Sequence, residues 1–164
     1  MSKRFSYSYS VLRYVHDVAT EEFINVGVAV FCPDSNDFFK VICRKNVGRV
    51  ANAFPNLNKK TFRSLMKTVL CRFEVLSNEI QGLALEEKGK TLVGLLSSVM
   101  PPDDSSLVWG SEASGLTNDP EAVINDLFER YVMVYESKSQ RENRTDDEIW
   151  RRFKKELEDR KIDQ

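Results

Sequence analysis

The alternation of hydrophobic and polar residues at the start of the chain predicts a β-hairpin. In the segment 5–15, apolar residues alternate with Ser6, Ser8 and Ser10, so one face is apolar and the other carries hydroxyl groups. The segment 23–31 alternates in the same way and follows a short polar connection. One of its faces carries Ile24, Val26, Val28 and Val30, and the other Phe23, Asn25, Gly27, Ala29 and Phe31.

The next part of the chain predicts a third strand and a long helix. The turn residues 34–37 lead into a strand over 38–44, which we expect to pair with the second strand. One or two helical turns follow within 47–54. Asn58 is the expected N-cap of a helix running to about Ile80, because its apolar residues recur at a spacing of 3.6.

The remaining pattern completes an α+β fold. It predicts a short helix over 91–99, a short strand over 107–110, and a helix that starts at Asp119 and buries one face from Val123 to Val134. We expect one domain over 1–135: an antiparallel sheet of three to five strands, covered mainly on one face by the helices 58–80 and 119–135.

The tail differs in composition from this domain. Residues 136–144 are polar and predict a linker, and a capping box at 145–148 begins an amphipathic helix. Trp150 and Phe153 lie on its narrow apolar stripe. A lone helix of this kind is marginal in water, so we expect it to dock on its own domain or on a partner.

Two segments resemble a bacterial family, domain of unknown function 3037. The first is the hairpin, from Tyr7-Ser8-Tyr9-Ser10-Val11 to Cys32-Pro33, and the second is Gly115-Leu116-Thr117-Asn118-Asp119-Pro120 with the helix after it. The resemblance implies a Gly-Leu turn before that helix, but no activity and no catalytic residues. Genes of the family are reported beside genes for kinases like the HipA toxin, which implies a HipA-like kinase as one candidate protein partner.

Composition limits the function classes. The chain has 164 residues, of which 41% are hydrophobic and 30% charged, with a net charge of −1. No apolar run is long enough to span a membrane, no signal peptide is recognisable, and the three cysteines form no CxxC pair, so we expect a cytoplasmic protein with reduced, buried thiols. His16 is the single histidine and is expected to be exposed. With no catalytic or nucleotide-binding motif, we expect no metal, no cofactor and no assigned catalytic residue.

A charge asymmetry is the strongest functional signal. Between Phe38 and Phe73 the chain has nine cations and no Asp or Glu. Cations in the first turn of a helix oppose its dipole, and they are favoured there if an anion binds. The alternative is a solvated helix face. The candidate residues for binding an anion or nucleic acid are Lys45, Arg49, Lys59, Lys60, Arg63 and Lys67.

A polar cluster within the hairpin is the second signal. Antiparallel pairing brings Arg13 near Asn25, with Glu22 near the connection, and Gly27 indicates a bulge or a close approach of another backbone. The three side chains could bind a small polar ligand, or they could close one face of the sheet with an ion pair and a hydrogen bond.

These signals lead to two hypotheses. The first is a non-enzymatic binding or adaptor protein whose basic surface engages nucleic acid or an acidic protein; the family resemblance suggests a phage-defence or toxin–antitoxin setting. The alternative is a small enzyme acting on a phosphate-containing substrate through Arg13, Glu22 and Asn25.

Overall fold

The computed structural model describes residues 3–82, 91–100, 106–134, 151 and 154–155. The chain divides into two compact units, Met1–Val132 and Met133–Gln164. Trp150 and Phe153 lie outside the described residues, so the expected linker and partner helix stay predictions, as does the domain boundary at 135. Within the described residues, no helix is both long enough and apolar enough to cross a membrane.

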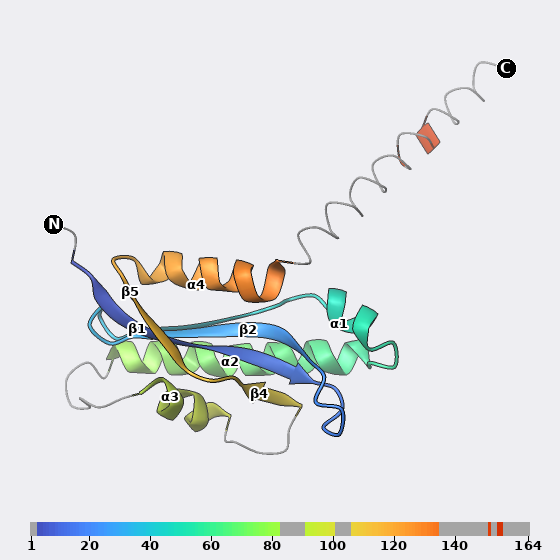
Figure 1. Ribbon diagram of the computed structural model, residues 1–164, viewed down its shortest axis with the longest axis horizontal. Helices are drawn as coiled ribbons and strands as arrows, with labels where there is room; N and C mark the ends of the chain where they lie inside the picture. The colour runs from blue at the N-terminus through green and yellow to red at the C-terminus, as the bar shows by residue number, and fades with distance from the viewer. Residues whose placement is uncertain (1–2, 83–90, 101–105, 135–150, 152–153, 156–164) are drawn as a thin grey trace. The chain divides into compact units, whose positions relative to one another are not determined.

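The first unit contains a five-stranded antiparallel sheet, which confirms the predicted α+β fold (Figure 1). Its strands are β1 (Phe5–Val15), β2 (Phe23–Cys32), β3 (Phe38–Cys43), β4 (Leu107–Trp109) and β5 (Ala113–Thr117). β2 lies between β1 and β3, as predicted. The other edge of β1 pairs with two short strands in succession, β5 along Phe5–Tyr9 and β4 along Leu12–Tyr14.

The helices are α1 (Gly48–Ala53), α2 (Lys59–Gly82), α3 (Leu92–Val99) and α4 (Pro120–Phe128), and α4 continues into a π-helical turn, η1 (Glu129–Met133). Asn58 caps α2 as predicted, because its Oδ1 accepts a hydrogen bond from the Thr61 amide at 3.1 Å. Asp119 caps α4 in the same way through the Ala122 amide at 3.2 Å.

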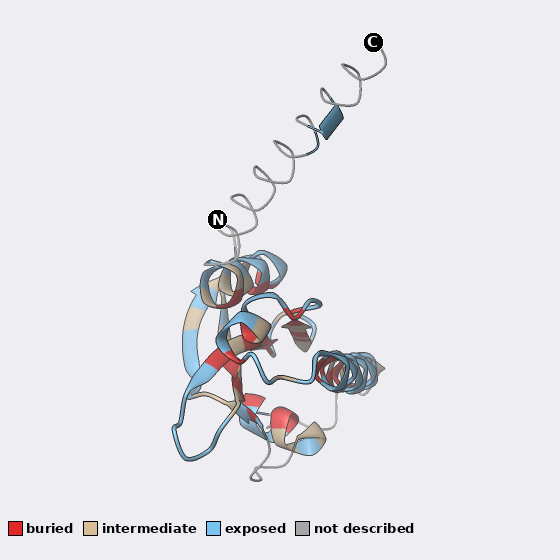
Figure 2. Ribbon diagram, turned by 90° about the vertical axis from the view of Figure 1, so that its right-hand side faces the viewer, coloured by how far each residue is buried: buried red, intermediate tan, exposed pale blue. Residues whose placement is uncertain are grey.

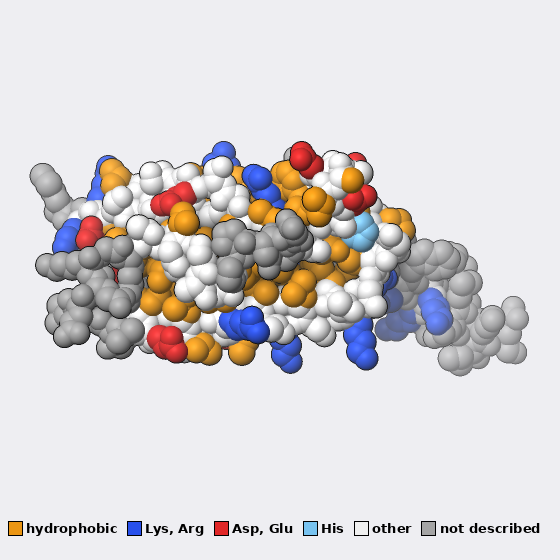
Figure 3. Space-filling view, turned by 90° about the horizontal axis from the view of Figure 1, so that it is seen from below, with side chains coloured by type: hydrophobic (Ala, Val, Ile, Leu, Met, Phe, Trp, Pro, Cys, Tyr) orange, Lys and Arg blue, Asp and Glu red, His pale blue; other side chains and the backbone are white. Residues whose placement is uncertain are grey.

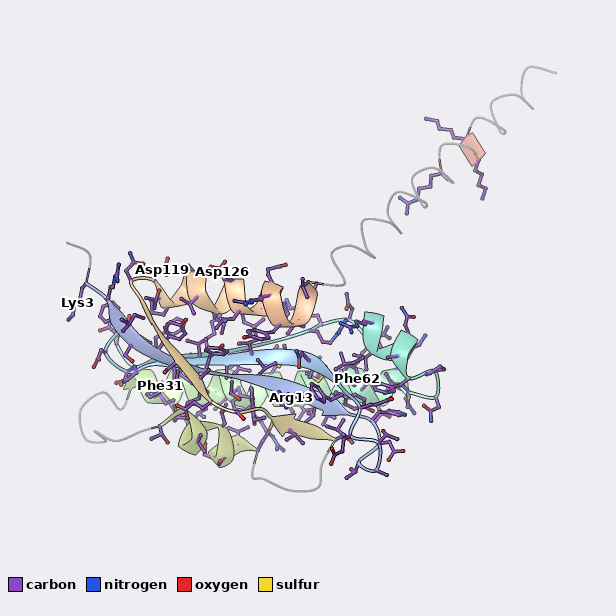
Figure 4. The ribbon with its side chains drawn as sticks, in the orientation of Figure 1. Lys3, Arg13, Phe31, Phe62, Asp119 and Asp126 are labelled. Carbon is purple, nitrogen blue, oxygen red and sulfur yellow. The ribbon has the colours of Figure 1, made fainter. Side chains whose placement is uncertain are left out.

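The two main helices lie on opposite faces of the sheet, so the prediction that both cover mainly one face was wrong. α2 contacts the face of Phe39, through Phe73 and through a hydrogen bond from Ser77 Oγ to the Phe39 carbonyl. α4 lies on the face of Lys40, which forms an ion pair with Glu121. Figure 2 shows buried residues where the helices face the sheet, and Figure 4 labels Phe31 and Phe62 in the core on the α2 side.

A β-bulge determines which residues of β2 lie on each face of the sheet. The register runs Leu12 opposite Gly27 and then Arg13 opposite Asn25, so Val26 is an extra residue in β2. The bulge exchanges the two faces of β2 beyond it. Val26 therefore shares the α2 side with Phe31, whereas Val28, predicted to share a face with Val26, points to the α4 side.

Two further expectations need correction near the C-terminal end of this unit. Gly115 and Leu116 lie within strand β5 and do not form the Gly-Leu turn. A β-carbon at Gly115 would lie 2.5 Å from the Tyr7 hydroxyl, so any side chain there would require the Tyr7 ring to move. In η1 the wider π-helical turn places Val132 in the core and leaves Val134 40% exposed.

The cysteines follow the prediction only in part. Cys32 and Cys43 are buried free thiols, but Cys71 is exposed on α2, contrary to the expectation of a buried residue. Burial raises the pKa of Cys43 to about 12.

Candidate functional site

The structure separates the nine cations of the basic segment into different roles. Lys40 is paired with Glu121 of α4. Arg44 is almost fully buried, and its guanidinium donates hydrogen bonds to the Asn46 backbone oxygen at 3.0 Å and to Asn46 Oδ1 at 3.3 Å. These two cations therefore have structural partners within the domain.

The six candidate binding residues are all exposed. Four of them lie within the first three turns of α2. These four, Lys59, Lys60, Arg63 and Lys67, are named the α2 basic surface. Lys59, Arg63 and Lys67 are four residues apart, which places them on one side of the helix at steps of about 6 Å. Among the residues that the structure describes, no acidic side chain forms an ion pair with these four.

Lys45 lies just before α1 and Arg49 lies within it. Both residues precede the α2 basic surface in the chain. Burial lowers the pKa of Arg44 to about 10, and the positive charge of Arg49 contributes in the same direction. Arg44 therefore remains protonated at neutral pH, and its charge adds to the basic character of the α1 region.

An aromatic cluster fixes the position of the α2 basic surface. His16, which is half-buried rather than exposed as predicted, stacks on Phe54 with the ring centroids 4.4 Å apart. Its Nε2 donates to Asn56 Oδ1 at 2.8 Å, and its Nδ1 accepts from the Tyr14 hydroxyl at 3.0 Å. Tyr14 also packs edge-on against Phe62 of α2, at 5.1 Å. The histidine is thus a connection between β1 and the chain entering α2.

Acidic residues collect on the other side of the sheet. Asp119, Glu121, Asp126 and Glu129 are exposed along α4 and η1. Figure 4 labels Asp119 and Asp126 along α4, on the opposite side of the sheet from α2. The near-neutral chain is therefore electrostatically two-sided, with an acidic α4 and a basic start of α2.

The polar cluster is assembled only in part. Arg13 and Asn25 lie opposite each other in the register, as predicted, whereas Glu22 is exposed in the connection before β2. The Arg13 guanidinium lies 4.4 Å from the centre of the Phe23 ring. The Asn25 amide nitrogen donates to the Tyr131 carbonyl at 3.1 Å.

Sequence reasoning did not anticipate the neighbours of this cluster. A β-carbon at Gly110 would lie 3.2 Å from Arg13 Cζ, so the backbone directly after β4 also packs against the guanidinium. Two atoms, Arg13 Nε and Asn25 Oδ1, are buried without a hydrogen-bond partner among the described residues. The contacts with Phe23, Gly110 and Tyr131 are those of a cluster that joins β1, β2, β4 and η1.

Within the described residues, no group of three or more His, Cys, Asp and Glu side chains could hold a metal ion. A protein-family model, described as Protein of unknown function (DUF3037), matches residues 9–132. Apart from Tyr7 and Ser8 at the start of the first segment, the match includes both segments that carry the resemblance and the whole stretch between them. No curated protein and no solved structure matches the chain.

Proposed function

This chain belongs to the family described as Protein of unknown function (DUF3037), and from that premise we propose that it is a non-enzymatic binding protein whose α2 basic surface contacts the phosphate backbone of a nucleic acid. The observation that carries the proposal is the gathering of Lys59, Lys60, Arg63 and Lys67 on an exposed helix start without ionic partners among the described residues.

The energetics of the helix support an anionic ligand. Each cation in the first turn opposes the helix dipole by about 0.3–1 kcal/mol, and α2 has no acidic residue in that turn to offset it. A bound phosphate reverses this balance, because it interacts favourably with both the side chains and the helix terminus.

The surface favours contact with phosphates over reading of bases. Phe62 and Phe73, the aromatic residues of α2, are buried, so they offer no platform on which bases could stack. Contacts made by lysine and arginine to phosphate oxygens fix orientation but carry no sequence information. We therefore expect little discrimination among nucleic-acid sequences.

The proposed setting is a toxin–antitoxin or phage-defence system with a HipA-like kinase as protein partner, which follows from the family resemblance alone, and the proposed location is the cytoplasm, which follows from the composition. The alternative function is an enzyme acting on a phosphate-containing substrate. Its support is the pair of unpartnered atoms, Arg13 Nε and Asn25 Oδ1. The exposed position of Glu22 and the packing of Arg13 on Phe23 favour the binding protein.

The test compares two triple charge reversals that change the net charge equally. Lys59→Glu, Lys60→Glu and Arg63→Glu together remove most of the α2 basic surface and place acids where the helix dipole favours them. Lys3→Glu, Arg4→Glu and Arg130→Glu together form the matched control, since these three cations are also exposed and lie off α2. Figure 4 labels Lys3 and Phe62 at opposite ends of this unit.

Binding is measured by fluorescence anisotropy with labelled duplex and single-stranded probes at low salt. We expect the wild type and the matched control to bind, and the α2 variant to lose binding while retaining its circular dichroism spectrum. Equal loss in both variants would mean that net charge alone attracts the probe. Absence of wild-type binding at low salt would overturn the nucleic-acid proposal and leave an acidic protein as the partner to test.

A further inference from the structure

A cavity of about 250 Å³ lies between α3 and the β1–β4 edge of the sheet. Its apolar walls come from Leu92, Val93, Leu96 and Met100 of the α3 region and from Trp109 of β4. Viewed from below, hydrophobic side chains gather in the middle of this face (Figure 3). Because an apolar cavity of about 150 Å³ holds benzene, this one has room for a larger ring system.

The packing of α3 leaves apolar surface beside the cavity. Leu92, Leu95 and Leu96 are buried and anchor the helix to the core. Val93 on α3 lines the cavity, yet it is 55% exposed. A single exposed valine is ordinary, but one at the wall of a cavity is surface that a bound apolar group would remove from water.

The polar side chains of the cavity include an acceptor, Ser10 Oγ, and a donor, Trp109 Nε1, which is buried without a hydrogen-bond partner among the described residues. Ser10 is almost completely buried and donates its hydroxyl hydrogen to the Gly110 carbonyl at 2.8 Å. A serine hydroxyl has one hydrogen and two lone pairs, so Ser10 Oγ keeps acceptor capacity at the cavity wall.

Among the lining residues that the structure describes, Glu112 is the one charged side chain, and none is a lysine or an arginine. A carboxylate attracts cations and repels anions, and the indole face of Trp109 also favours a cation. This environment is the reverse of that on the α2 basic surface.

We infer that this cavity binds a small molecule with an apolar, preferably aromatic, body and a cationic or hydrogen-bond-donating head group. The apolar body occupies the space between Leu92, Leu96 and Trp109. The head group donates toward Ser10 Oγ or pairs with Glu112 at the rim. The inference stands independently of the proposed nucleic-acid surface, because the two use different residues and opposite charges.

Three probes with a common ring test the head group: tryptamine, indole and indole-3-acetate, which are cationic, neutral and anionic at pH 7. Each is titrated into the full chain labelled with ¹⁵N, and the amide signals of Ser10, Val93 and Glu112 are followed together with the indole signal of Trp109. We expect tryptamine to shift these four signals most strongly, indole to shift them weakly and indole-3-acetate to leave them in place.

Two tryptophan substitutions test the location. Val93→Trp fills the cavity from α3 and should abolish tryptamine binding. Val75→Trp is the matched control, since Val75 is a similarly exposed valine on a helix, at 52%, and does not line the cavity. If Val93→Trp fails to fold, Ser97→Leu fills the same space from a half-buried position.

A third substitution tests the charge. Glu112→Gln leaves an exposed polar side chain and should reduce the preference for tryptamine over indole-3-acetate by about tenfold or less, as expected for one solvent-exposed charge pair. Equal binding of tryptamine and indole-3-acetate by the wild type, unchanged tryptamine binding by the cavity-filling variants, or absence of binding by all three probes would each overturn the inference.

Discussion

Gly27 on β2 lies against Cys43 on β3 so closely that a β-carbon at position 27 would stand 3.0 Å from Cys43 Sγ. The Ile42 carbonyl oxygen lies equally near that position. Gly27→Ala should therefore destabilise the domain by about 1–3 kcal/mol, because an extra methyl in a tightly packed interior displaces its neighbours. Urea denaturation followed by circular dichroism measures the loss.

Partial rescue distinguishes this mechanism from a loss of backbone freedom. Adding Cys43→Ala to Gly27→Ala removes the Sγ contact but leaves the Ile42 carbonyl in place. The double variant should be more stable than the sum of the two single effects predicts, since residues in contact couple energetically. Strictly additive effects would show that the sulfur contact does not limit the packing.

Val26, the extra residue of the bulge, gives a second prediction. It is completely buried on the α2 side, so Val26→Asp places a charge without a partner in the core. We expect a loss of more than about 4 kcal/mol, which approaches the whole free energy of unfolding of a domain at the lower end of ordinary stability. Val75→Asp, on the exposed side of α2, is the control. A thermal melt of Val26→Asp that matches the wild type would contradict the assignment of the strand faces.

The same bulge shows where sequence reasoning succeeded and where it failed. The strands β1 and β2 followed from period-two alternation, β3 followed from the turn residues before it, and Asn58 marked the start of α2, because turns, caps and periodicity are local properties. The exchange of faces after Val26 was missed because a bulge depends on the register of the partner strand. β5 was missed because the resemblance implied a turn at Gly115, which instead pairs with Tyr7 of β1, a strand far away in the sequence.

Alkaline pH should weaken the fold through Cys43. Burial raises its folded-state pKa from 9.0 to about 12, so the folded protein holds the thiol proton more tightly than the unfolded chain. The stabilisation that the protonated Cys43 thiol provides is complete below pH 9, and it is lost as the pH rises from 9 toward 12. The free energy of unfolding should fall by up to about 1.4 kcal/mol per pH unit for this one group.

Urea denaturation at several values between pH 7 and 11 tests the effect. The pH dependence should become shallower in Cys43→Ala, even if that variant is less stable overall. Cys71→Ala is the matched control, since it also removes a free thiol, but one that is exposed on α2. Burial also raises the pKa of Tyr14, so some alkaline weakening should remain in every variant. Identical slopes for Cys43→Ala and the wild type would contradict the prediction.

The sequence predicted the cations of the candidate site but not which of them have partners within the domain. The run of cations from 38 to 73 was visible in the sequence, yet nothing in it distinguished Lys40 and Arg44, which have structural roles, from the exposed cations of α2. That difference depends on Glu121 of a distant helix and on the local turn at Asn46. The cavity beside Trp109 was also invisible, because α3, β1 and β4 meet there from separate parts of the chain.

The salt dependence of nucleic-acid binding gives the sharpest test of the α2 basic surface. Each phosphate contact on duplex DNA contributes about −0.9 to the slope of log K against log salt concentration, because contact releases condensed counterions. If Lys59, Lys60, Arg63 and Lys67 each contact one phosphate, the slope should be about −3.6. On a single strand the slope should be shallower, at about −0.7 per contact.

Single substitutions then count the contacts one at a time. Alanine at any one of these four positions should make the duplex slope shallower by about 0.9 and weaken binding to a similar degree on unrelated sequences. Lys40→Ala is the control, because its ammonium group is already paired with Glu121 and lies on the α4 side of the sheet. A slope that stays the same in all four variants, or that changes as much in Lys40→Ala, would show that the bound phosphates lie elsewhere on the protein.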